Sequence, residues 1–171
     1  LDAEAPASIF HHEAEMAVII GKDAENKVDA KDAMDYVFGY TGFIDVSARN
    51  VGPEGRTSFF QVKSWRTFGP MGPFIITKDE VDDPQNIDLA ITVNNSGRQA
   101  FNTSDMAHPV TECIEFATRQ FPLHAGDIIS TGTNHQGLGA LQNGDVLKFE
   151  VGNVGSMTLN VKDSLNREWE R

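Results

Sequence analysis

The chain has 171 residues and its composition excludes several classes of protein. This length fits one domain, and 40% hydrophobic with 23% charged residues is ordinary for a globular fold. Its 14 basic and 25 acidic residues give a net charge of −11, which predicts no nucleic-acid partner and no anionic membrane partner. The single cysteine, Cys113, excludes an internal disulfide, and no signal-peptide pattern opens the chain. We therefore expect a cytoplasmic protein.

The first half of the chain predicts short strands with one helix between them. An N-cap at Asp29 and apolar residues at helical spacing predict a helix over 29–38. The other predicted elements are strands over 13–20, 40–47 and 74–77, a loop over 49–58 and an irregular segment with two Gly-Pro steps over 68–73.

The second half predicts more strands and one further helix. Residues 94–97 read as a hairpin turn between strands over 87–93 and 98–102. Pro109, placed at the first helical position, starts a helix over 109–120 that carries Cys113 on its apolar face. Two Gly-Asp turns, at 126–127 and 144–145, each lead into a strand, and a last strand covers 156–162. The sequence thus predicts a single domain that is mainly β with short helices.

Three acidic residues stand where a metal ion can be bound. Glu13 and Glu15 point to the same face if they lie on a strand, although such a pair is commonly just the solvated face of an exposed strand. Asp45 lies among apolar residues, where a carboxylate is costly to bury unless it is paired or binds a cation. Ligands that are all oxygen select a hard ion, Mg²⁺ first, with Mn²⁺ or Ca²⁺ as alternatives.

Other polar residues are candidates for the same site. Lys63 lies among apolar residues, so its ammonium either reaches a site or stays at the surface. Arg49 follows Asp45 closely and can clamp a carboxylate. The turn over 130–133 is built of small residues that can donate hydrogen bonds to an anion. His11 and His12 either support the acids or begin a strand.

The order of these motifs resembles the fumarylacetoacetate hydrolase family. Several motifs stand in family order between about residues 9 and 162: HHEAEMAVIIGK from His11, AMDYVFGY from Ala33, IDVSARN from Ile44, Lys63-Ser64, GPMGP from Gly69, GDIISTGT from Gly126 and GSMT from Gly155. The HHExE and AMDYV motifs are most similar to those of the acylpyruvase and oxaloacetate decarboxylase branch.

The resemblance implies a mixed β-roll that forms one catalytic domain over residues 1–171 and assembles as a homodimer. It also implies a role for each candidate: Glu13, Glu15 and Asp45 as ligands of Mg²⁺, Lys63 and Arg49 as catalytic residues beside the metal, and Gly132 and Thr133 as the turn that holds the substrate carboxylate.

The activity implied is metal-dependent hydrolysis of the C–C bond of a small anionic 2-oxo acid of the acylpyruvate or β-diketo type. Alternatives are an oxaloacetate decarboxylase or tautomerase, a 2-hydroxy-diene-dioate isomerase, a dehydratase of 2-keto-3-deoxy sugar acids, and a catalytically silent ligand-binding member. Family members of this branch carry a Tyr-x-x-His-x-x-Glu stretch and a lid upstream of the HHExE strand, and neither is present in this chain. We therefore expect an upstream segment and a lid to be missing. Asn134 and His135 follow Gly-Thr where many relatives have proline, which predicts a different pocket selectivity.

Overall fold

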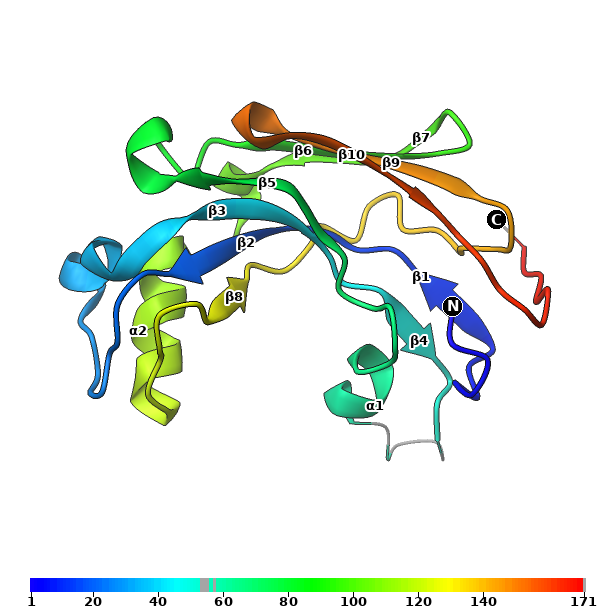
Figure 1. Cartoon of the computed structure of the whole chain (residues 1–171), viewed down its shortest axis with the longest axis horizontal. Coiled ribbons are helices and arrows are strands. Elements are labelled where there is room, and N and C mark those ends of the chain that lie inside the picture. Colours follow the sequence, from blue (N-terminus) through cyan, green and yellow to red (C-terminus); the bar gives the residue numbers. More distant parts are fainter. Residues whose placement is uncertain (53–55, 57, 171) are drawn as a thin grey trace.

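Two antiparallel four-stranded sheets pack against each other in the computed structural model, which describes residues 1–52, 56 and 58–170 (Figure 1). One sheet has the order β5-β3-β2-β8, formed by Met71–Thr77, Val37–Ile44, Ala14–Ile20 and Ile128–Ser130. The other has the order β10-β9-β6-β7, formed by Gly155–Asn160, Val146–Val151, Asp88–Val93 and Ser96–Asn102. The predicted mainly β fold class is confirmed.

The facing sides of the two sheets bury one apolar core. Met16, Val18 and Ile20 alternate along β2, and Leu147 and Phe149 alternate along β9, all at most 1% exposed. Burying a side chain of this size stabilises a fold by about 1.5–3 kcal/mol. The period of two therefore fixes which face of β2 enters the core, and it leaves the other face for Glu15.

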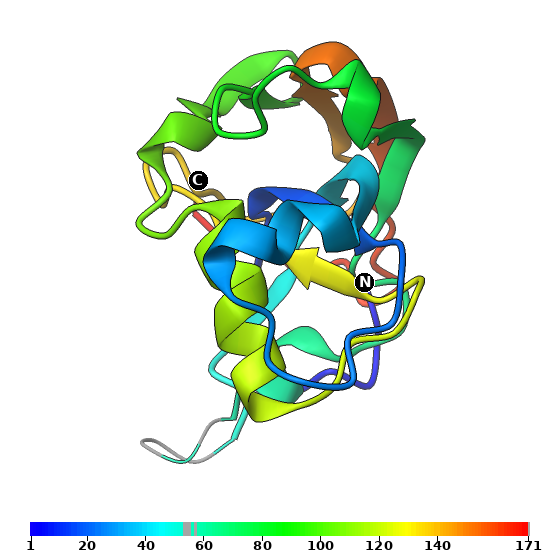
Figure 2. The same ribbon diagram turned by 90° about the vertical axis from the view of Figure 1, so that its left-hand side faces the viewer.

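The remaining elements lie around the β5-β3-β2-β8 sheet. Figure 1 shows the helices α1 (Phe59–Lys63) and α2 (Val110–Gln120) on the side of this sheet away from the second sheet, and the end view in Figure 2 separates the two layers. A small two-stranded sheet joins β1 (Ile9–His11) to β4 (Ser47–Arg49). Four 3-10 helices complete the described elements: Ala30–Tyr36, Lys78–Glu80, Thr103–Asp105 and Gly152–Val154.

Several predicted elements are confirmed, including the hairpin. Asn94 and Asn95 both take positive φ values, 52° and 64°, as a two-residue turn between twisted strands requires. In the Gly-Asp turns, Asp127 accepts from the N–H of His124, and Asp145 accepts from the N–H of Gln142. These bonds close the turns that lead into β8 and β9.

Other predicted boundaries were wrong. The helix predicted over 29–38 is the 3-10 helix Ala30–Tyr36, because the next residues join β3, and the Asp29 side chain pairs with Lys27 instead of capping. The strand predicted over 40–47 stops at Ile44, so Asp45 lies between β3 and β4 and not within a strand. Pro109 is the N-cap of α2, one position before the predicted place.

The chain between Arg49 and β5 also differs from its prediction. Arg49 ends β4 instead of opening a loop, and residues 53–55 and 57 of the loop predicted over 49–58 lie outside the described residues. Helix α1 was not predicted; it begins at a capping box formed by Ser58 and Gln61. Strand β5 starts at Met71, inside the segment predicted to be irregular. No helix in the described part of the chain is both long and apolar enough to cross a membrane.

Candidate metal centre

Three carboxylates converge at one end of the β2–β3 ladder. Ala14 pairs with Ile44, so Glu13, just before β2, and Asp45, just after β3, leave the ladder side by side. The backbone N–H of Asp45 donates to the carbonyl of Glu13 at 2.9 Å. Glu15 shares their side of β2, and one carboxylate oxygen from each of the three residues lies within 4.8 Å of the others. The structure thus brings together the three acids that the sequence singled out.

Lys63 and Arg49 supply positive charge to this cluster. The Lys63 ammonium donates to Glu13 Oε2 at 2.6 Å, to Ser47 Oγ at 2.7 Å and to a carboxylate oxygen of Asp45. Arg49 pairs with the other oxygen of Glu13 and donates from Nε to His11 Nδ1 at 3.2 Å. Burial alone would raise the pKa of Glu13, but the bond from Lys63, together with the Lys63 and Arg49 charges, lowers it.

Glu15 forms no ion pair with any described residue. It is 3% exposed, and it accepts hydrogen bonds from the Ser130 hydroxyl and from the backbone N–H of Gly132 at 3.1 Å. Burial, with the Asp45 charge as a second cause, raises the pKa of Glu15 to about 8. Burial also raises the pKa of Asp45, against the opposing effect of Lys63. The cluster therefore combines three carboxyl groups with only two cations, Lys63 and Arg49. Near neutral pH the Glu15 carboxyl group holds a proton, which balances the charge.

This donor set fits a hard divalent cation. The three ligand groups offer only carboxylate oxygens, which suit Mg²⁺ or Mn²⁺. A dication would offset both the burial and the repulsion that raise the pKa of Glu15, and it would replace the proton held there. Among the described residues a second group, Asp23, Glu25 and His124, lies exposed at the surface, where water can solvate its charges.

The turn after β8 contacts the cluster directly. Gly132 takes a φ of +82°, which glycine adopts without strain, and this places its N–H on Glu15. The Thr133 hydroxyl accepts from Gln99 Nε2 at 2.9 Å. Gly132 thus contacts one of the acids, and Thr133 is linked to the segment that carries them through Gln99. The contact of either residue with a substrate carboxylate stays a prediction.

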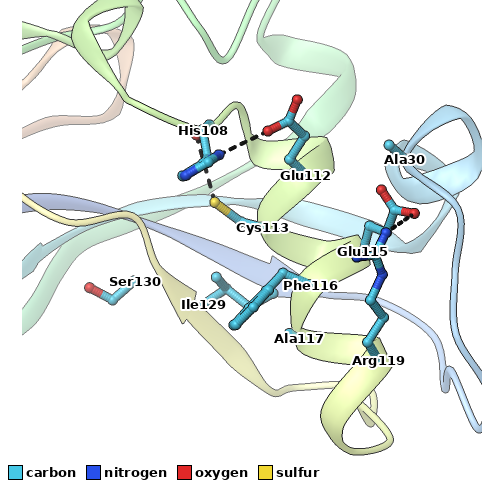
Figure 3. Close-up of a pocket in the computed structure, with 10 residues that line it drawn as sticks. All are labelled: Ala30, His108, Glu112, Cys113, Glu115, Phe116, Ala117, Arg119, Ile129 and Ser130. Carbon is cyan, nitrogen blue, oxygen red and sulfur yellow. Dashed lines mark hydrogen bonds and ion pairs between the residues drawn. The ribbon is translucent and has the colours of Figure 1, made fainter.

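A cavity of about 680 Å³ lies between α2 and β8 (Figure 3), and its lining residues do not include the three acids. It is lined by Ala30, His108, Glu112, Cys113, Glu115, Phe116, Ala117, Arg119, Ile129 and Ser130. Ser130 belongs to both places, because its hydroxyl bonds Glu15. The prediction that Cys113 packs in the core was wrong: the buried face of α2 consists of Val110, Ile114 and Thr118, and Cys113 is half-buried on the cavity wall.

Two residues of the site were not singled out from the sequence. The Ser47 hydroxyl accepts a hydrogen bond from the Lys63 ammonium. Gln99, on the second sheet, accepts from the N–H of Ala14 and so holds the ligand segment, residues 13–15. Ser47 has a sequence signal, because it stands two positions after Asp45 in an extended segment. His12 is fully buried against Gln99, and His11 accepts from Arg49, so both histidines support the site. The alternative that they begin a strand was wrong, because His11 ends β1 and His12 lies before β2.

A two-sheet β-roll with an acidic, oxygen-only site at the end of its central ladder is the class of domain that this geometry defines. The sequence profile described as "Fumarylacetoacetate (FAA) hydrolase C-terminal" matches residues 3–162. The chain belongs to the fumarylacetoacetate hydrolase family.

Its relatives include enzymes that act on small oxo acids. The chain is 39% identical to maleylpyruvate hydrolase of Aquipseudomonas alcaligenes over 151 residues, 88% of this chain and 50% of that protein. A solved maleylpyruvate hydrolase from Sphingobium sp. SYK-6, in complex with manganese(II) ion and pyruvate, has a TM-score of 0.82 and 37% identity, covering 90% of this chain and 55% of its own. The 2-hydroxyhepta-2,4-diene-1,7-dioate isomerase of Mycobacterium marinum has a TM-score of 0.86 and 34% identity, covering 94% and 61%. The chain spans about half the length of the curated relatives it matches.

Proposed function

We propose that this chain is the metal-binding catalytic domain of a hydrolase that cleaves the C–C bond of a small 2-oxo acid of the acylpyruvate type. The observation that carries the proposal is the convergence of three carboxylates, one of which, Glu15, accepts hydrogen bonds from Ser130 and Gly132 and pairs with no cation in the described part of the chain. The similarity to maleylpyruvate hydrolases, one of them in complex with manganese(II) and pyruvate, supports both the substrate class and the need for a divalent ion.

In this proposal Glu13, Glu15 and Asp45 hold Mg²⁺ or Mn²⁺. The ion, when bound, polarises the oxo group of the substrate and stabilises the negative charge that C–C cleavage leaves behind. The Lys63 ammonium, which donates to Glu13 and Asp45, would stabilise an oxyanion that forms on a substrate bound at these acids. Arg49 orients Glu13 through their ion pair, and Gly132 and Thr133 offer donors to the substrate carboxylate.

Isomerisation or decarboxylation of a 2-oxo diacid is the second candidate. The similarity to a 2-hydroxyhepta-2,4-diene-1,7-dioate isomerase favours it. These reactions need the same stabilisation of charge next to the oxo group, but they need no hydrolytic water. A catalytically silent ligand-binding member would keep the metal centre and turn over neither kind of substrate.

The test is incubation of the protein with acetylpyruvate and, separately, with oxaloacetate, in Mg²⁺, in Mn²⁺ and in EDTA. Hydrolysis predicts that one water is consumed and that acetate and pyruvate appear in equal amounts only when metal is present. Lys63→Met serves as the control for background cleavage. Turnover of oxaloacetate alone would favour the second candidate, and turnover of neither substrate would contradict both.

We also propose that the chain forms a homodimer and works in the cytoplasm on this anionic substrate. Met71, Phe74, Ile75 and Ile128 are 48%, 69%, 54% and 41% exposed and line one groove across β5 and β8. An apolar surface of this kind favours a protein partner over water. Analytical ultracentrifugation of the wild type and of Phe74→Asp tests it: a dimer that the substitution dissociates is expected, and a monomeric wild type contradicts the proposal.

A further inference from the structure

The side-chain amide of Gln99, on β7 of the second sheet, contacts both halves of the acidic site. Gln99 is 1% exposed. Its Oε1 accepts from the N–H of Ala14 at 3.1 Å and lies 3.0 Å from His12 Nδ1. Its Nε2 donates to Thr133 Oγ1 at 2.9 Å and to the carbonyl of Asn134 at 2.6 Å. One residue of the opposite sheet thus holds two segments that meet at the acids.

These partners determine the orientation of the amide. A backbone N–H can only donate and a backbone carbonyl can only accept, so Oε1 faces Ala14 and Nε2 faces Asn134. His12 Nδ1 lies opposite Oε1 and therefore carries the ring proton. Every hydrogen-bonding position of the Gln99 amide is used, so four bonds fix this side chain in place, although within the described part of the chain His12 Nε2 is buried without a partner.

The two segments held by Gln99 are the parts of the site that the sheet itself does not connect. The ladder between β2 and β8 ends with the bond from the N–H of Thr131 to the carbonyl of Met16 at 3.1 Å. Beyond that bond the described residues of these two segments share no backbone hydrogen bond, and only the Glu15 carboxylate reaches the turn directly. Ala14 stands between Glu13 and Glu15, and Thr133 follows Gly132, whose N–H bonds Glu15. Gln99 bridges this gap.

We propose that Gln99 is a positioning residue that sets the distance between the metal ligands and the substrate-binding turn; the substrate half of this inference rests on the proposed function. Some groups do not touch the metal but hydrogen-bond its ligands and orient them. Removing such a group typically lowers metal affinity or activity about 10- to 100-fold. Gln99→Met keeps the length of the side chain and removes all four contacts. It is expected to raise both the metal dissociation constant and the KM by about 10-fold.

Gln99→Glu tests the effect on the metal ligands separately from the effect on the substrate-binding turn. Its carboxylate still accepts from the N–H of Ala14 and from His12, and the Thr133 hydroxyl can turn to donate to it. It repels the carbonyl of Asn134, which loses its donor. This variant is expected to keep metal affinity within about 3-fold of the wild type while the KM rises about 10-fold.

The chain offers a matched control in Gln85. Its amide also bridges two segments, accepting from the N–H of Val110 at 2.8 Å and donating to the carbonyl of Thr103 at 3.2 Å, and none of these partners contacts the acids. Gln85→Met is expected to lower the melting temperature and to leave the metal dissociation constant and the KM unchanged.

The experiment measures the Mn²⁺ dissociation constant by titration, together with kcat and KM for acetylpyruvate, in the wild type, Gln99→Met, Gln99→Glu and Gln85→Met. Weaker metal binding in Gln99→Met but not in Gln85→Met supports the proposal. Equal metal affinity in both would overturn it. If the wild type binds Mn²⁺ but turns over no acetylpyruvate, the proposed function fails while the metal titration still decides the role of Gln99. If Gln99→Met does not fold, a KM unchanged in Gln99→Glu overturns the proposal.

Discussion

The carboxyl group of Glu15 makes the stability of the metal-free protein depend on pH. Its pKa rises from 4.5 to about 8 on folding, chiefly because the group is buried. Between these values the folded protein keeps a proton that the unfolded chain has released. The contribution of Glu15 is therefore full below about pH 4.5 and is lost as the pH rises toward 8, so stability should fall across this window.

The size of the effect follows from the two pKa values. Between pH 5.5 and pH 7.5 the linkage relation gives a loss of about 2–3 kcal/mol in the free energy of unfolding. For a chain of this length, that corresponds to a decrease of about 5–10 °C in the melting temperature. Glu15→Gln keeps the shape of the side chain and cannot ionise, so this decrease should disappear.

Urea unfolding and thermal melts in EDTA at the two pH values measure this difference. Glu150→Gln, at an exposed position, is the control for removing one negative charge. Excess Mg²⁺ should stabilise the wild type more at pH 7.5 than at pH 5.5, because metal and proton compete for the same carboxylate. The reasoning fails if the wild type and Glu15→Gln lose the same stability between the two pH values.

Three further substitutions test the surroundings of the site and the fold. Lys63→Met should lower the free energy of unfolding in EDTA by about 2 kcal/mol, because it removes the cation that pairs with Asp45 and one of the two that pair with Glu13. Excess Mg²⁺ should restore the stability in a thermal melt. Asp163→Asn should lower the free energy of unfolding by about 2 kcal/mol at pH 7, because the hydrogen bonds from Arg167 lower the pKa of Asp163 to about 2. In urea unfolding, the difference in stability between this variant and the wild type should shrink as the pH falls from about 4 to 2. Gly39→Ala should destabilise the protein by at least about 2 kcal/mol in urea, because its Cβ would lie 2.0 Å from the carbonyl oxygen of Ile76, whereas Gly97→Ala meets no atom within 4 Å and should change the stability by less than about 0.5 kcal/mol.

The sequence predicted the acids of the site because local periodicity carries that information. Glu13 and Glu15 share a face under the period of two, and β2 realises it. Asp45 was recognised from its apolar neighbours, but its position in mid-strand was wrong. Composition does not reveal where a ladder breaks, and here β3 ends at Ile44 while the chain turns to pair with β1.

The parts of the site that depend on distant contacts had no local signal. Gln99 lies 85 residues from Ala14 and 34 from Thr133, so its role exists only after the two sheets have packed. Cys113 fits the helical spacing of α2, yet the packed face of the helix passes through Ile114, and a rotation of one position moves the thiol to the cavity wall. Tertiary packing decides both points.

The central claim is that Glu13, Glu15 and Asp45 bind one divalent cation together. Asp45→Asn keeps the volume of the side chain and removes one of the three negative charges. Titration of Mn²⁺, with the free ion followed by electron paramagnetic resonance, measures binding without depending on activity. The account predicts one site per chain in the wild type and at least about 10-fold weaker binding in Asp45→Asn. Equal Mn²⁺ affinity in the two proteins would contradict it.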